Sequence, residues 1–250
     1  PVLFPAGRLV ESGRRVALLT GRDGMEAADA MHQRTISLPL STRRLALESE
    51  TANQITHAFG TLLAVIGTFF IVDRAWSTGS PDRVVGCAVY GATLIALYAA
   101  STLSHSFSEP RLRSFFRMLD QVCIFLLVVG SYTPFGLVHV TSGPLASLLA
   151  IMWGLAAIGI LFRMFSGNRM VSIACYVALG WMPILTLGRI YEVGQTPGLA
   201  MVLGGGLSYT CGTWFLANDD RHPYFHAVWH LMVILGSTFH YLFLLQFVAS

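Results

Sequence analysis

Long uncharged stretches alternate with short charged segments along this chain. The longest uncharged runs cover residues 84–108, 121–162 and 193–218. A helix that crosses the hydrocarbon core of a membrane needs about 20 largely apolar residues. Seven stretches meet this requirement, and they predict helices at 52–73, 84–105, 120–140, 145–163, 170–190, 197–217 and 225–248. The run 121–162 is long enough to cross twice, with a break at Thr141-Ser-Gly-Pro144, because Gly and Pro disfavour helix continuation.

The composition agrees with a membrane protein. Hydrophobic residues make up 54% of the 250 residues and charged residues only 12%, whereas charged residues are about 25% of a soluble domain. No stripe of basic and aromatic residues marks a nucleic-acid surface. The predicted fold class is therefore an all-α membrane protein, a bundle of seven transmembrane helices.

The arginines predict the orientation of the bundle, because positive residues concentrate on the cytosolic side of a membrane. All 16 basic residues are arginine, and 13 of them lie before the first predicted helix or in the second, fourth and sixth connections. We therefore expect a cytosolic N-terminus, a C-terminus outside, and a multi-pass protein of the inner (plasma) membrane. Residues 1–47 form an Arg-rich cytosolic extension that we expect to be mobile, and 48–250 form the seven-helix domain.

Polar side chains gather near one end of the predicted bundle. They stand on four predicted helices: Glu50, Asn53 and His57 on the first, Ser101 and His105 on the second, Asp120 on the third, and His226 and His230 on the seventh. With the orientation above, all of them lie within two or three turns of the cytosolic face. Because ionisable groups inside a membrane are costly unless they are paired or bound to metal, we expect these helices to surround one cavity.

The histidine spacing predicts a metal site. His226 and His230 stand at i and i+4, so that both imidazoles can point at one position, and His105 can complete a set of three nitrogens. Three nitrogen ligands with a fourth position open are typical of catalytic Zn²⁺. We expect Asp120 to act as the base and Ser101 to donate a hydrogen bond, with Glu50, Asn53 and His57 supporting the ligands.

Ordinary roles stay open for these polar residues. A single membrane histidine usually bonds a neighbouring carbonyl, and this is what we expect of His240. Arg111, Arg113 and Arg117 are expected to set the topology and attract anionic headgroups, with contact to a substrate phosphate as the alternative.

Three motifs resemble the signatures of the progestin and adipoQ receptor family, and most of all its bacterial hemolysin III branch. They are Glu50-x-x-Asn53-x-x-x-His57, Ser101-x-x-x-His105 followed by Asp120, and His226-x-x-x-His230. The likeness covers residues 48 to 248. It implies seven helices with an inside N-terminus, zinc held by the residues matching His105, His226 and His230, and an aspartate matching Asp120 that acts through water. The family is also grouped with alkaline ceramidases among membrane hydrolases.

These observations favour a zinc-dependent hydrolase of lipid amides or esters at the inner leaflet, with a membrane lipid as substrate or ligand and no protein partner. Two alternatives stay open: a pore-forming or cytolytic protein, as the hemolysin name suggests, and a zinc-stabilised membrane sensor without turnover. The predicted spans lack the repeated polar stripe that lines a water-filled pore.

Overall fold

The computed structural model describes residues 40–166 and 168–250. These residues form helices and no strand, which confirms the predicted all-α class. The elements are α2 (Leu40–Ser77), α3 (Pro81–Ser106), α4 (Pro110–His139), α5 (Leu148–Ser166), α6 (Arg169–Trp181), the short 3-10 helix η1 (Met182–Thr186), α7 (Leu187–Ala217) and α8 (Phe225–Phe247). Residues 1–39, most of the predicted Arg-rich extension, lie outside the described residues, and residues 40–47 are the first turns of α2.

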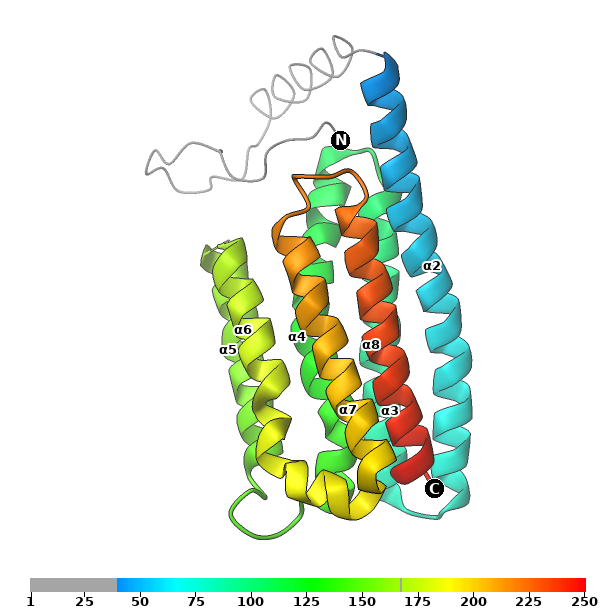
Figure 1. Ribbon diagram of the computed structural model, residues 1–250, viewed down its shortest axis with the longest axis vertical. Coiled ribbons are helices and arrows are strands. Elements are labelled where there is room, and N and C mark those ends of the chain that lie inside the picture. The colour runs from blue at the N-terminus through cyan, green and yellow to red at the C-terminus, as the bar shows by residue number, and fades with distance from the viewer. Residues whose placement is uncertain (1–39, 167) are drawn as a thin grey trace.

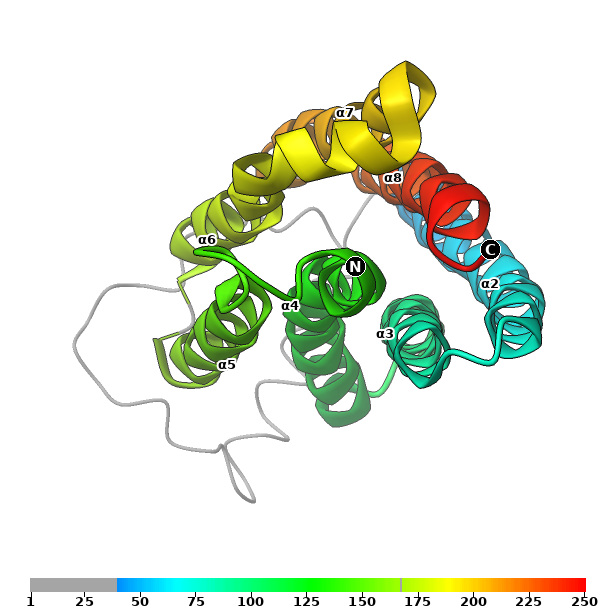
Figure 2. The ribbon, with the colours of Figure 1, turned by 90° about the horizontal axis from the view of Figure 1, so that it is seen from below.

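The helices form a ring in sequence order that closes where α8 packs beside α2 (Figure 2). The start of α2 and the α3–α4, α5–α6 and α7–α8 connections lie together at the top of Figure 1, and we call this the histidine end. The C-terminus lies at the opposite, far end of the bundle.

The outer surface of the ring is apolar. Phe165 is 86% exposed, Trp76 73% and Phe69 68%, although a soluble monomer rarely exposes contiguous apolar patches of large area. Within the described residues, six segments are long and apolar enough to cross a membrane, and one of them, Arg169–Ala217, has 49 residues. The chain is therefore a multi-pass membrane protein, while the predicted number of seven crossings stays a prediction.

Small residues let α3 and α4 pack closely. A Cβ atom added to Gly130 would lie 2.3 Å from Oγ1 of Thr93, and one added to Gly86 would lie 2.6 Å from the Cα atom of Pro134. Small residues at helix contacts are typical of membrane proteins, in which dispersion contacts hold helices together. This close contact fixes α3, which carries Ser101 and His105, against α4, which carries Asp120.

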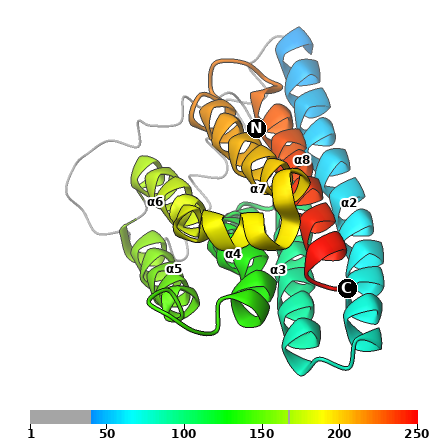
Figure 3. The same cartoon turned by 60° about the horizontal axis from the view of Figure 1, so that its bottom comes forward.

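The structure corrects the boundary between the predicted helices 170–190 and 197–217. The predicted helix 170–190 ends at Trp181, and η1 and the first part of α7 run across the far end of the bundle (Figure 3). Pro183 lacks the N–H that would continue the α-helix. Helix α7 begins at Leu187, before the predicted start at 197. It bends at Gln195, which has a φ of 49° and stands two residues before Pro197.

Helix α4 begins ten residues before its predicted start at 120. The Glu109 side chain accepts hydrogen bonds from the backbone N–H groups of Arg111 (3.0 Å) and Leu112 (2.7 Å) and so caps the helix. Pro110 occupies the first turn, where its missing N–H leaves no bond unmade. As a result Arg113 and Arg117 stand on the same helix as Asp120.

Candidate metal centre

Three histidine side chains meet at the histidine end. His105 stands in the last turn of α3, and His226 and His230 occupy successive turns at the start of α8. One ring nitrogen of each histidine lies within 4.8 Å of a ring nitrogen of the other two. The three side chains could therefore hold one metal ion, while the identity of the ion stays a prediction.

Two of these histidines are held by carboxylates. Nδ1 of His105 lies 2.7 Å from Oε2 of Glu50 on α2, and Nδ1 of His226 lies 2.9 Å from Oδ2 of Asp219 in the α7–α8 connection. An ionised carboxylate only accepts hydrogen bonds, so each Nδ1 carries the hydrogen and donates it. In the neutral imidazole this leaves the lone pair on Nε2.

The third histidine is held by the backbone of α2. Nδ1 of His230 lies 3.1 Å from the carbonyl oxygen of Asn53 and 3.1 Å from Oγ1 of Thr56. The Thr56 hydroxyl itself donates to the carbonyl oxygens of Ala52 and Asn53 (both 2.9 Å). It therefore accepts from His230, whose hydrogen is again on Nδ1.

The free nitrogens fit a metal ion. Nε2 of His230 is buried and has no hydrogen-bond partner among the described residues. A buried polar atom without a partner requires an explanation such as a missing ion or water. Metal-binding histidines characteristically donate their other N–H to a carboxylate or a carbonyl, which is what all three Nδ1 atoms do here.

An arginine binds each of the two supporting carboxylates. Nη2 of Arg113 on α4 lies 2.6 Å from Oε1 of Glu50, and Nη2 of Arg169 on α6 lies 2.8 Å from Oδ2 of Asp219. Burial acts to raise the pKa of Asp219, but the hydrogen bonds from His226 and Arg169 outweigh it and hold the pKa below its ordinary value. Asp219 therefore stays an acceptor at neutral pH.

Asp120 and Ser101 lie beside the histidines. The Ser101 side chain is fully buried, and its Oγ has no hydrogen-bond partner among the described residues. It faces the Asp120 carboxyl, although the contact falls short of hydrogen-bond geometry. Asp120 is also close enough to His226 and Arg117 for their charges to act on it. A hydroxyl and a carboxyl thus stand next to the three nitrogens without being tied to each other.

Asn53 and His57 make contacts that their side-chain chemistry did not predict. Asn53 supports His230 through its backbone carbonyl, and its side-chain Oδ1 is buried without a partner. The His57 ring stacks on His230, with centroids 3.5 Å apart and planes at 19°, and meets the edge of Tyr98 at 5.0 Å. Both ring nitrogens of His57 are buried and have no hydrogen-bond partner in the described part of the chain.

Sequence reasoning missed Asp219 and Thr56 as supports of the site. It also did not foresee that Arg113 and Arg169 bind the supporting carboxylates: it gave Arg169 a role in topology, and Arg113 roles in topology and in binding headgroups or a substrate phosphate. Asp219 stands seven residues before His226, but the intervening turn is not helical, so no periodicity relates the two. The available signal was weaker: an acidic residue in the connection just before two histidines. The pairing of Arg169 with Asp219 spans 50 residues and is decided by the packing of α6 against α7.

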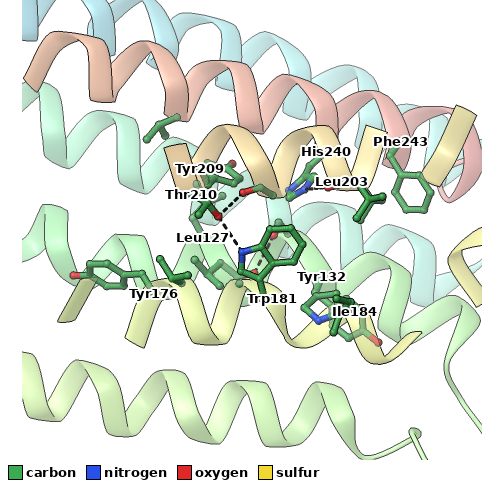
Figure 4. Close-up of a pocket in the computed structure, with 18 of the residues that line it drawn as sticks. Leu127, Tyr132, Tyr176, Trp181, Ile184, Leu203, Tyr209, Thr210, His240 and Phe243 are labelled. Atoms are coloured by element: carbon green, nitrogen blue, oxygen red, sulfur yellow. Dashed lines mark hydrogen bonds between the residues drawn. The ribbon is translucent and has the colours of Figure 1, made fainter. Parts of the chain in front are cut away.

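A mainly apolar cavity lies below the site, bounded by α3, α4, α6, η1, α7 and α8 (Figure 4). Its lining on α4 runs from Ile124 to Phe135, about 16 Å at 1.5 Å per residue. Ile124 is one turn beyond Asp120, and Leu97, also in the lining, is one turn before Ser101. The cavity therefore begins about one helical turn from the histidine cluster.

Few polar groups interrupt the cavity wall. Nε1 of Trp181 donates to Oγ1 of Thr210 (2.9 Å), which joins α6 to α7 (Figure 4). His240 borders the cavity, and its Nε2 lies 3.3 Å from the carbonyl oxygen of Val202. His240 thus makes the bundle hydrogen bond that was expected of it.

Comparisons with known proteins agree with these motifs. The model of the family described as haemolysin-III related matches residues 45–241. Hemolysin-3 of Bacillus cereus is 38% identical over 76% of this chain and 88% of its own length. The hemolysin-3 homolog of Bacillus subtilis (strain 168) is 33% identical over 76% of this chain and 90% of its own. The human monocyte to macrophage differentiation factor is 31% identical over 76% of this chain and 80% of its own.

Proposed function

The chain belongs to the haemolysin-III-related family, and we propose that it is a zinc-dependent hydrolase that cleaves amide or ester bonds of membrane lipids. The family resemblance inferred from the three motifs is thereby confirmed. The reaction, the zinc ion and the lipid substrate are the proposal.

The observation that carries the proposal is the unequal use of the two nitrogens on each histidine. Nδ1 of His105, His226 and His230 is in each case hydrogen-bonded to a carboxylate or a backbone carbonyl, which leaves the Nε2 lone pair of each neutral ring for a metal ion, and one ring nitrogen of each histidine lies within 4.8 Å of the other two. Three histidine nitrogens with no fourth protein ligand among the described residues leave one position for substrate or water, as in catalytic zinc sites. A closed structural site would use four protein ligands.

The neighbouring side chains supply the rest of the chemistry. A bound zinc ion polarises a carbonyl and lowers the pKa of water. Asp120 accepts the proton of the attacking water, because its carboxyl lies close enough to His226 for the charge of that histidine to act on it. The Ser101 hydroxyl, also without a partner among the described residues, donates to the oxygen on which negative charge develops. Asp120 then returns its proton to the leaving amine or alcohol.

The cavity supports a lipid as the substrate. Its lining is mostly apolar and it begins about one turn from Asp120 and Ser101, so an acyl chain lying in it places its carbonyl near the histidines. The same lining favours an acyl chain over a water-filled conduit, which separates this proposal from a pore.

We further propose seven membrane crossings with the histidine end in the cytosol. Helix α6 and the longer part of α7 run in opposite directions (Figure 1), so Arg169–Ala217 would cross twice. The excess of arginines before α2, in the helix turns nearest the histidine end and in the α7–α8 connection supports a cytosolic site at the inner leaflet of the plasma membrane. Single cysteines at Ser108 and Ser142, introduced after the four native cysteines are replaced by serine, test this. Only the Ser142→Cys variant should react with an impermeant thiol reagent added outside cells.

The hydrolysis experiment uses the purified protein with stoichiometric zinc and a panel of lipid amides and esters. We expect release of free fatty acid by the wild type, and a loss in kcat of about 100-fold or more in Asp120→Asn. Ser101→Ala should retain zinc and lose rate. The absence of fatty-acid release from every lipid, beside an active alkaline ceramidase, would refute the proposal.

A sensor that binds lipid without turnover is the second candidate, because the same cavity and histidines would serve it. Chelation of the metal distinguishes the two. Loss of turnover with the fold intact supports catalysis, whereas unfolding of the bundle without any measurable turnover supports a structural metal in a sensor.

A further inference from the structure

The arginines near the mouth of the histidine site differ in their partners. Arg113 binds Glu50, Arg169 binds Asp219, and Arg163 binds Gln121. The Arg117 side chain is exposed, and it makes no hydrogen bond or ion pair with any residue that the structure describes. Its guanidinium therefore keeps its donors available.

Arg117 points to the side of α4 that faces the site. Arg113, Arg117 and Asp120 stand at i, i+4 and i+7, which places them on one helical face. On this face, Arg113 binds Glu50, and Asp120 lies close enough to His226 for the charge of that histidine to act on it. The charges close enough to act on Arg117 come from Arg113, Glu50, Asp219 and Asp120, all of them groups of the site.

The supporting carboxylates are already engaged. Glu50 uses one oxygen for Arg113 and the other for His105, and Oδ2 of Asp219 accepts from both Arg169 and His226. Taking either carboxylate for Arg117 would loosen a histidine of the cluster. The remaining carboxyl close to Arg117 is Asp120, the proposed base, and an ion pair with it would compete with its proton transfer. An anion from outside the protein is thus the partner that Arg117 can bind at no cost to the site.

The order of groups along α4 indicates which kind of anion Arg117 binds. The cavity wall begins at Ile124, Asp120 stands one turn closer to the histidine end, and Arg117 one turn further. In an acyl lipid the scissile carbonyl joins the chain to the headgroup. A lipid with its chain in the cavity and its carbonyl at the histidines therefore directs its headgroup toward Arg117.

We propose that Arg117 binds an anionic group in the headgroup of the lipid substrate, so that the preferred substrates are phosphate-bearing acyl lipids. This proposal rests on the lipid-binding mode of the proposed function. Charge-assisted hydrogen bonds from a guanidinium to phosphate oxygens provide the discrimination. Neutral lipids with the same acyl chains lack this contact.

The test compares two lipids that differ only in the phosphate, a short-chain phosphatidic acid and the diacylglycerol with the same chains. Binding to the zinc-loaded full chain in detergent is measured for the wild type, Arg117→Gln and Arg111→Gln. Arg111 is also exposed and stands about 120° around α4 from Arg117, away from the face that carries Asp120. We expect the wild type to prefer the phosphatidic acid about tenfold or more, Arg117→Gln to lose the preference, and Arg111→Gln to keep it.

Three results of this comparison would overturn the proposal. The first is equal affinity of the wild type for both lipids, and the second is a preference that Arg117→Gln keeps. The third is an equal loss in Arg111→Gln, which would mean general surface electrostatics. Inorganic phosphate should fail to displace the phosphatidic acid because it lacks acyl chains. Efficient displacement would mean that Arg117 binds a free anion and not a lipid headgroup. If the preference holds but no fatty acid is released, the hydrolase proposal is refuted, whereas the binding of an anionic headgroup by Arg117 is retained.

Discussion

The histidine end and the middle of the bundle both bury polar side chains, but they pair them differently. In the middle, the hydroxyls of Tyr98 and Tyr209 lie 3.0 Å and 2.8 Å from Oγ of Ser237, and His240 bonds a backbone carbonyl. At the histidine end, Nε2 of His230 and Oγ of Ser101 have no partner among the described residues. Paired groups join helices, whereas unpaired groups that converge from several helices indicate a ligand.

Helix α8 contains a histidine of each kind, ten residues apart. His230 and His240 are carried by the same rigid helix, yet only His230 meets other histidines. The difference between them is therefore one of surroundings and not of residue type. The variants below test whether metal binding and stability separate between these two regions.

The largest effect is expected from removing a proposed ligand. His226→Ala should lower zinc affinity by more than the roughly 10- to 100-fold typical of supporting residues, because a nitrogen ligand is lost. His240→Ala should leave the affinity unchanged, since His240 lies in the middle of the bundle. Competition with a chromogenic chelator measures both, and similar losses in the two variants would contradict the assignment of the site.

Removing a supporting carboxylate should have a smaller effect. Asp219→Ala takes away the acceptor for Nδ1 of His226 and leaves Arg169 unpaired, so zinc affinity should fall by roughly 10- to 100-fold. The matched control is Asp220→Ala, which changes the exposed neighbouring carboxylate. The same chelator competition applies, and an unchanged affinity in Asp219→Ala would remove this residue from the site.

In the middle of the bundle the expected effect is on stability alone. A Cβ atom at Gly205 would lie 2.3 Å from the His240 ring, so Gly205→Ala should destabilise the bundle by about 1–3 kcal/mol without changing zinc affinity. A Cβ atom at Gly154 meets nothing within 4 Å, and Gly154→Ala should change stability by less than about 1 kcal/mol. Thermal unfolding in detergent measures both, and a zinc effect in Gly205→Ala would contradict the separation.

The smallest effect is expected at the α3–α4 connection. Hydrogen bonds from the N–H groups of Leu112 and Arg111 hold the pKa of Glu109 below its ordinary value of 4.5. A lowered pKa stabilises the fold above 4.5, and this contribution is lost as the pH falls through the lowered value. Glu109→Gln should therefore slightly reduce the Tm at neutral pH and match the wild type well below pH 4. A constant difference at all pH values would refute the role of the charge.

Much of the site could be predicted because helical periodicity acts over short distances. The i, i+4 spacing of His226 and His230 and the common depth of His105 predicted the cluster that the structure forms. Glu50 also lies against His105, as a supporting residue should. These predictions needed only a rise of 1.5 Å per residue and the positions of the helix ends.

Other contacts depended on details that no pattern contains. Asn53 bonds His230 through its carbonyl, which every residue possesses, so the residue type carried no information about the contact. Asp219 lies in a non-helical turn, where spacing in sequence does not determine direction in space. The α-helix ends at Trp181 and η1 follows because Pro183 stands in the run, although the run stays apolar on both sides of it.

The amino-acid sequence by itself determined the class of the protein, the family, and which residues stand at the histidine end, because hydropathy and helical period are local properties of the chain. Only the tertiary structure decided which histidine nitrogens are bonded to supporting groups, that Arg113 and Arg169 have carboxylate partners while Arg117 has none among the described residues, and where the cavity begins. These properties depend on how α2, α3, α4, α6 and α8 pack, and packing brings together residues as far apart as Asn53 and His230.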